Sequence, residues 1–349
     1  MKKRITNWFL ISLLTLVGTP LWLVNGIAAE VTLMTHDSFN VSKEVVAAFE
    51  KKHGFKIRFL KSGDAGAALN KAILSKNNPL GDLFFGVDNT FMSRGLKAGI
   101  FEVYRSPLLK DIKPELQLDS EYRLLPVDYG DVCLNYDKKW FAQKGIKPPS
   151  KLSDLIMPNY KSLTVVENPA TSSPGLAFLL TTIGVFGEKR YLQYWRQLRA
   201  NDVLVTNGWE QAYWGQFSAA SKGNRPIVVS YASSPPAEVH FAGKPLNEAP
   251  TAAVTTKQTC FRQIEFVGIL KGSKKQEMAR KLIDFLLDRT FQEDIPLQMF
   301  VFPANKKAEL PAVFLKHAKV ATSPVILNSA RIAANREQWI ESWTETVLR

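Results

Sequence analysis

The sequence has few of the residues, and none of the short motifs, on which metal and nucleotide chemistry depend. It contains two cysteines and four histidines, and the histidines are scattered at positions 36, 53, 240 and 317. No HExxH motif, phosphate-binding P-loop, Rossmann glycine motif or nucleophile elbow occurs. A zinc site and the enzyme classes that carry these motifs are therefore not indicated, and we expect neither a metal nor a cofactor.

The chain also lacks internal repeats, low-complexity segments and a basic stripe interleaved with aromatic residues. Its formal net charge is +13, but the lysines and arginines mostly alternate with acidic and apolar residues. This pattern predicts a solvated basic surface and no nucleic-acid partner. A length of 349 residues with a globular composition predicts two domains with a substantial core.

Long apolar runs are limited to one, close to the first residue. A basic start at residues 2–4 precedes an apolar stretch over residues 8–24, and small residues follow at 26–29. This arrangement predicts a secretory signal peptide over residues 1–29, with an uncleaved membrane anchor as the alternative. No cysteine stands near the cleavage site, which argues against a lipoprotein, and no later segment is apolar enough to span a membrane. We therefore expect an exported protein.

Strand and helix patterns alternate through the first part of the chain. Apolar segments at 55–60 and 82–89 read as strands, and polar, glycine-containing turns and helical patterns lie between and after them. This alternation predicts an open α/β sheet with ligands at the carboxyl ends of its strands.

Two extended segments, 124–137 and 258–270, interrupt the alternation, and each contains one cysteine. If both cross between two lobes, they lie side by side and bring Cys133 next to Cys260. Export permits a disulfide between them, and a catalytic thiol is the alternative. The expected first lobe is 30–126 with 258–310, the second lobe is 127–257, and 311–349 is a C-terminal helical segment packed on the lobes. An exported, two-lobed α/β chain of this kind describes a bacterial solute-binding protein.

A run of hydroxyl residues, Thr171, Ser172 and Ser173, leads into Pro174 and an apolar helix. Ser173 is the predicted N-cap, because proline is favoured at the first helical position. The free amides of such a helix start can bind a phosphate or another small polar group. The simpler interpretation is that the hydroxyl only caps the helix.

Eight segments in order resemble the thiamine-binding subunits of ABC transporters: THDSF, SGDAG, GDLFFGVDNTF, PVDYGDVCLNYD, NPATSSPGLAFLL, NGWEQAYWGQF, VVSYASSPPAEV and TCFRQIEFVGIL. The resemblance covers most of the chain after residue 29. It implies a two-lobed type II periplasmic-binding-protein fold that closes on thiamine, and possibly on its mono- and diphosphate. It also implies a periplasmic monomer without enzymatic activity, which reaches the membrane only through an ABC transporter permease and its ATPase.

The resemblance also implies a set of binding residues. It assigns the acidic turn of the first lobe, the hydroxyl loop, an aromatic wall and a row of strand-end donors, which are Asp64, Ala65, Ser172, Ser173, Trp209, Tyr231, Ala232, Ser233 and Ser234. Some family members carry a second stacking tyrosine where this chain has Pro236-Ala237-Glu238. His36 and Tyr129 are the candidates for that second wall.

The chemistry of thiamine fits these residue types. Its flat ring system and thiazolium cation suit Trp209, and a carboxylate should face the cation. Asp64 is the first candidate, and Asp37, Asp88 and Glu210 are alternatives. The hydroxyl loop should hold the hydroxyethyl or phosphate end.

Other interpretations stay open on the residues alone. Trp209, Tyr213 and Phe217 recur at helical spacing, which more often marks a core face. An iron(III)- or oxyanion-binding protein of the same fold is one alternative function, although Ala232 stands where iron sites commonly have a second tyrosine. A thiaminase-like enzyme is another, and it would need Cys133 or Cys260 as a free thiolate.

Overall fold

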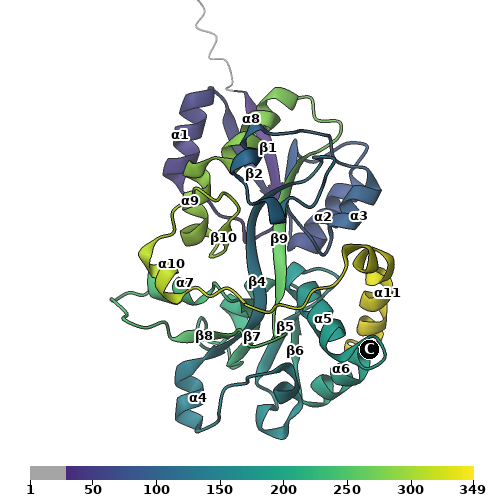
Figure 1. The fold of residues 1–349 in the computed structure, drawn as a ribbon, viewed down its shortest axis with the longest axis vertical. Helices are drawn as coiled ribbons and strands as arrows, with labels where there is room; N and C mark the ends of the chain where they lie inside the picture. The colour runs from purple at the N-terminus through teal and green to yellow at the C-terminus, as the bar shows by residue number, and fades with distance from the viewer. Residues whose placement is uncertain (1–28) are drawn as a thin grey trace, which may run out of the picture.

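The computed structural model describes residues 29–349 (Figure 1). The signal peptide predicted over residues 1–29, and the membrane anchor considered as its alternative, lie outside the described residues, apart from residue 29 itself. Within the described range, no helix is both long and apolar enough to cross a membrane.

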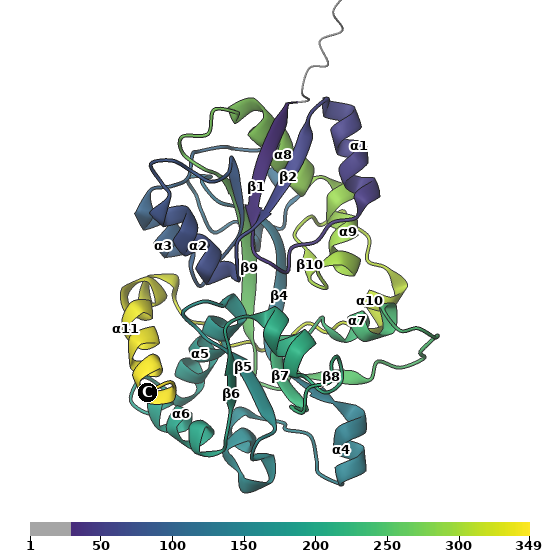
Figure 2. The ribbon, with the colours of Figure 1, turned by 180° about the vertical axis from the view of Figure 1, so that it is seen from behind.

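The strands form a sheet that continues through both halves of the molecule. Its order is β2-β1-β3-β9-β4-β7-β5-β6, and β8 and β10 each pair with β4. The strands are β1 (Glu30–Thr35), β2 (Lys56–Lys61), β3 (Leu83–Asp88), β4 (Leu125–Asp137), β5 (Thr164–Glu167), β6 (Leu204–Thr206), β7 (Ile227–Tyr231), β8 (Thr251–Val254), β9 (Phe261–Ile269) and β10 (Phe302–Pro303). Figures 1 and 2 show two lobes, one around β1–β3 and one around β5–β7, with β4 and β9 running through both.

Helices surround the sheet in each lobe (Figure 1). The lobe around β1–β3 contains α1 (Lys43–His53), α2 (Ala65–Leu74), α3 (Met92–Ala98), α8 (Gln276–Leu287) and α9 (Arg289–Gln298). The lobe around β5–β7 contains α4 (Lys138–Lys144), α5 (Ser173–Phe186), α6 (Tyr191–Ala200) and α7 (Pro235–His240), and the chain ends with α10 (Ala312–His317) and α11 (Ser329–Val347). The predicted α/β architecture with two lobes joined by crossovers is confirmed.

The two crossover strands lie side by side. β4 and β9 pair antiparallel, with Val132 opposite Phe261. Cys133 and Cys260 form a disulfide at this point, which confirms the predicted bridge. Because both sulfurs are bonded, neither cysteine offers the thiolate that a thiaminase-like mechanism requires.

We propose that the lobes divide as the sequence suggests, into 30–126 with 258–310 and 127–257. The segment from 311 to the end contacts both. Trp343 of α11 packs edge-on against Trp195 of α6, with ring centroids 5.4 Å apart. Arg336 on the same helix is buried and donates to Ser93 Oγ of α3 at 3.0 Å. Helix α11 therefore bridges the lobes on one side of the molecule, as Figure 2 shows.

A glycine in strand β3 makes room for the residue that follows the adjacent strand β1. Gly86 has φ +102°, and the pairing of β3 with β9 shifts register there. A Cβ at this position would come within 2.4 Å of the His36 ring. The bulge therefore lets His36, which directly follows β1, fold against the sheet.

Candidate functional site

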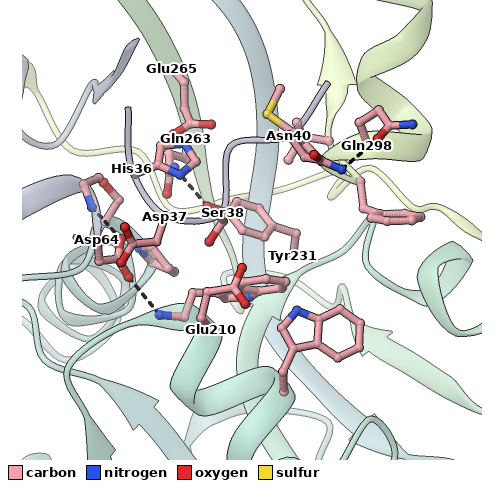
Figure 3. A pocket seen from close by; sticks show the side chains of 18 of the residues that line it. His36, Asp37, Ser38, Asn40, Asp64, Glu210, Tyr231, Gln263, Glu265 and Gln298 are labelled. Atoms are coloured by element: carbon pink, nitrogen blue, oxygen red, sulfur yellow. Dashed lines mark hydrogen bonds and ion pairs between the residues drawn. The ribbon is translucent and has the colours of Figure 1, made fainter. Parts of the chain in front are cut away.

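A cavity of about 340 Å³ lies between the two lobes (Figure 3). Residues from both lobes and from β9 line it, and they are His36, Asp37, Ser38, Asn40, Lys61, Asp64, Ala65, Ser173, Pro174, Trp209, Glu210, Trp214, Tyr231, Phe241, Gln263, Glu265, Gln298, Met299, Phe300 and Val301. Of the residues assigned from the family resemblance, Asp64, Ala65, Ser173, Trp209 and Tyr231 line the cavity, together with His36. Ser172, Ala232, Ser233 and Ser234 are buried behind its wall.

Trp209 forms a supported aromatic platform in this cavity. It follows β6, and Tyr213 stacks on its ring with centroids 4.8 Å apart and an interplanar angle of 20°. The indole Nε1 donates to Ser230 Oγ at 2.9 Å. Because Tyr213 covers one face of the indole, a flat ligand has only the other face on which to stack.

The rest of the aromatic stripe belongs to the core. Tyr213 and Phe217 are fully buried and pack with Val165 and Val228 of the sheet. Residues Gln211–Gln216 form a π-helical turn, which changes the spacing that an α-helix would give. The stripe is therefore divided between a ligand-facing tryptophan and two core residues.

The carboxylate of Asp64 joins the two lobes. Asp64 is the N-cap of α2, where Oδ1 accepts the Ala65 N–H at 2.6 Å, and Oδ2 accepts the Trp209 N–H at 2.8 Å. A Cβ at position 208 would lie 2.7 Å from Oδ2, so Gly208 permits this close approach. Burial raises the pKa of Asp64, although bonds from the Trp209 and Ala65 amides oppose that shift.

The hydroxyl loop differs from its prediction by one residue. Helix α5 begins at Ser173, and Ser172 is the N-cap, without a side-chain capping bond. Ser173 Oγ instead donates to Asp88 Oδ2 of the other lobe. Ser172 Oγ is buried without a hydrogen-bond partner among the described residues. The prediction that Ser173 caps the helix was therefore wrong.

Asp88 is a second carboxylate at the junction of the lobes. Besides Ser173, it accepts the N–H and the hydroxyl of Thr90, each at 2.5 Å. Burial raises the pKa of Asp88 to about 7, and the negative charge of Glu265 adds to this effect. Asp88 does not line the cavity, so its contribution is to the contact between the lobes.

Three acids stand opposite one another on neighbouring strands beneath the cavity. Glu265 of β9 pairs in register with Asp88 of β3 and with Asp128 of β4. His36 Nε2 lies 3.3 Å from Glu265 Oε1. Burial lowers the pKa of His36, but the Glu265 carboxylate outweighs this and leaves the pKa above its usual value. Burial and the Glu265 carboxylate raise the pKa of Asp128 well above its usual range.

Tyr231, at the end of β7, lies against the sheet. Its hydroxyl accepts a bond from Gln263 Nε2 at 3.0 Å. A Cβ at position 130 would come within 2.7 Å of its ring, so Gly130 provides the space.

The residues after Tyr231 support the walls of the cavity from behind. Ser234 Oγ bonds Ser230 Oγ at 2.8 Å and accepts the Tyr231 N–H at 3.2 Å. Ser230 in turn holds the indole of Trp209. Ala232 packs beside the disulfide. These positions orient Trp209 and Tyr231, and they do not face the cavity.

The two candidates for the second wall of the ligand site, His36 and Tyr129, differ in whether they line the cavity. His36 lines the cavity. Tyr129 is not among the lining residues, because its ring stacks on Phe302 and its hydroxyl accepts a bond from Lys113 Nζ at 2.7 Å.

Sequence reasoning missed several lining residues. Trp214, Phe241 and Phe300 place three more aromatic rings around the mouth of the cavity, and Phe241 and Phe300 meet edge-on at 5.5 Å. Asn40 and Gln298 hydrogen-bond at 2.7 Å across another part of the rim (Figure 3). Trp214 stands in the quoted aromatic segment and was available as a signal, but Phe241 and Phe300 follow helix ends and carry no pattern of their own.

Two lobes that meet around an aromatic and acidic cavity define a protein that encloses a small solute. A family model described as bacterial extracellular solute-binding protein matches residues 78–322. The chain therefore belongs to the family of bacterial extracellular solute-binding proteins.

Within that family, the chain is similar to the thiamine-binding periplasmic protein of Escherichia coli (strain K12), with 30% identity across 91% of this chain and 93% of that one. The thiamine-binding periplasmic protein of Brucella melitensis is 28% identical, and the match covers 97% of this chain and 99% of that one. The solved structure of a periplasmic thiamin binding protein has a TM-score of 0.81 and 27% identity, with 93% and 98% covered. These similarities confirm the predicted type II periplasmic-binding fold.

A second solved structure, the periplasmic binding protein AfuA from Actinobacillus pleuropneumoniae with fructose-6-phosphate bound, has a TM-score of 0.78 and 20% identity. The match covers 92% of this chain and 99% of that structure's chain. At that identity, the likeness shows a shared fold alone.

Proposed function

We propose that this protein captures thiamine in the periplasm and delivers it to the permease and ATPase of an ABC importer, acting as a monomer without chemistry on the ligand. The observation that carries the proposal is the Trp209 platform, backed by Tyr213, within an acidic cavity between two lobes. The similarity to thiamine-binding periplasmic proteins over nearly the whole chain supports the same ligand.

The charge of the cavity suits a cationic ligand. Four acids line it, namely Asp37, Asp64, Glu210 and Glu265, against Lys61 and His36. Asp64 is occupied by two backbone amides and Glu265 by His36. We therefore place the thiazolium over Trp209 and near Glu210, the next residue in the chain, where cation–π and charge attraction act together.

The opposite end of the ligand would meet two helix starts. Ala65 at the first turn of α2 and Ser173 at the first turn of α5 both line the cavity. Helix N-termini carry partial positive charge and attract oxygen-rich groups. We propose that the hydroxyethyl group, or the phosphate of a phosphorylated form, lies there.

Tryptophan fluorescence of the protein after removal of residues 1–29 tests this proposal. Added thiamine should quench the emission in a saturable, single-site manner, because it would stack on Trp209. The same titration with Trp209→Phe should lose most of the change. Emission that does not respond to thiamine at any concentration would contradict the proposal.

A further inference from the structure

A buried side-chain oxygen of the cavity wall lacks a hydrogen-bond partner among the described residues. Gln263 on β9 is 1% exposed and lines the cavity. Its Nε2 donates to the Tyr231 hydroxyl at 3.0 Å. Its Oε1 is buried and has no hydrogen-bond partner anywhere in residues 29–349. A buried carbonyl oxygen without a partner costs free energy, so a ligand that donates to it would recover that loss.

The Tyr231 hydroxyl supplies the complementary group beside this oxygen. It accepts the bond from Gln263, so its own proton is left to donate. Burial and the nearby carboxylates Glu265, Asp64 and Asp88 raise the pKa of Tyr231 well above its usual value, which keeps that proton in place. The wall therefore offers an acceptor and a donor side by side.

Both groups are held in position by the sheet. Gln263 stands opposite Gly130 of β4, and the absence of a side chain there lets the Tyr231 ring lie against the strand. Glu265, two residues along β9, is occupied by His36. Figure 3 shows Gln263, Glu265, His36 and Tyr231 along one side of the cavity. The acceptor and donor are thus rigid, which is a requirement for discrimination between similar ligands.

We propose that Gln263 and Tyr231 select the aminopyrimidine ring of the ligand by reading its hydrogen-bonding edge. Gln263 Oε1 accepts from the exocyclic amino group, and the Tyr231 hydroxyl donates to the adjacent ring nitrogen. An exocyclic amino group beside an unprotonated ring nitrogen presents this donor and acceptor order. The inference rests on the proposed function, and it adds the part of the ligand on which selectivity depends.

The test compares three ligands on the wild-type protein by calorimetric titration. Pyrithiamine keeps the aminopyrimidine but replaces the thiazolium with a pyridinium. Oxythiamine carries an oxo group in place of the amino group and a ring N–H in place of the acceptor nitrogen, so its edge is reversed. We expect pyrithiamine to bind within about 10-fold of thiamine, and oxythiamine to bind at least about 100-fold more weakly, because both wall groups then face groups of their own kind.

A substitution of Gln263 tests whether its amide is responsible for the discrimination between thiamine and oxythiamine. Gln263→Leu should reduce the preference for thiamine over oxythiamine to within about 5-fold, because the leucine neither accepts nor donates. Gln276→Leu, at the start of α8 and outside the cavity, should keep the wild-type ratio. Thermal melting of each variant shows whether it folds, and the wild-type titrations decide the question if Gln263→Leu does not.

The outcomes separate this inference from the proposed function. Thiamine binding without discrimination against oxythiamine would overturn the inference alone. Tighter binding of oxythiamine would also overturn it, because the amide N–H₂ would then face the ligand. A protein that binds neither thiamine nor pyrithiamine would overturn the proposed function and this inference with it.

Discussion

The carboxylate of Asp64 in one lobe accepts the backbone N–H of Trp209 in the other lobe at 2.8 Å. One hydrogen bond therefore connects the start of helix α2 to the aromatic platform, and it forms only when the lobes are together. We therefore expect closure of the cleft and placement of the indole to be coupled through this contact.

Asp64→Asn should weaken thiamine binding by about 10-fold, because the amide is a poorer acceptor and a charge-assisted bond is lost. X-ray scattering with ligand should show a larger radius of gyration than for the wild-type protein. Asp202→Asn, which changes an acid paired with Arg225 within one lobe, is the matched control. Unchanged affinity and compactness in Asp64→Asn would mean that the bond does not contribute to closure.

Trp209→Ala should weaken thiamine binding by about 2 kcal/mol or more, because stacking and cation–π energy are lost together. Its melting temperature should stay near that of the wild type, since Tyr213 and Phe217 carry the core. Trp140→Ala, on α4 outside the cavity, should leave affinity unchanged. A collapse of melting with retained affinity would assign Trp209 to the core.

Asp88 should make stability depend on pH. Its pKa is about 7 in the folded protein against an ordinary value of 3.8, so the folded state holds a proton that the unfolded state has released. The contribution of Asp88 to stability is therefore fully present below the pKa of the unfolded state and is lost as pH rises toward 7, by up to about 1.4 kcal/mol per pH unit.

Asp88→Asn removes this titration and keeps an acceptor for Thr90. Urea unfolding at several pH values should show a shallower fall in the free energy of unfolding for the variant than for the wild type between about pH 5 and 7. Parallel curves for the two proteins would show that Asp88 ionises at its ordinary pKa.

Arg336 should stabilise the packing of α11 on the first lobe. Arg336→Met removes the bond to Ser93 Oγ and should lower the melting temperature by about 3 °C or more, because a buried charged donor is lost. Arg331→Met is the control on the same helix, since Arg331 is exposed and pairs with Glu188. Equal effects of the two substitutions would contradict a special role for Arg336.

Much of the fold was accessible from the sequence because its signals are local. Each buried strand is an apolar run, and the cysteines mark the two crossovers, so β4, β9 and their disulfide followed from pattern and spacing. The start of α5 was displaced by one residue because the partner of Ser173 is Asp88, a residue distant in sequence. Sequence rules for helix ends use neighbouring residues only, so they could not predict the contact between Ser173 and Asp88.

The site was harder to predict for the same reason. Trp209 and Tyr231 stand in segments that resemble a family, but the resemblance could not separate Tyr231, which lines the cavity, from Ser233, which is buried behind it. Which side chains at the end of a strand face the cavity depends on the conformation of the turn that follows the strand. Phe300 has a left-handed backbone with φ 55°, and its place at the mouth depends on the loop after α9, which carries no periodic signal.

Calorimetric titration of thiamine into the protein lacking residues 1–29 tests the central claim most directly. We expect one site per chain with a dissociation constant of about 1 μM or tighter, which corresponds to about 8 kcal/mol of binding free energy. Absence of measurable heat with millimolar thiamine, in protein shown by melting to be folded, would contradict it.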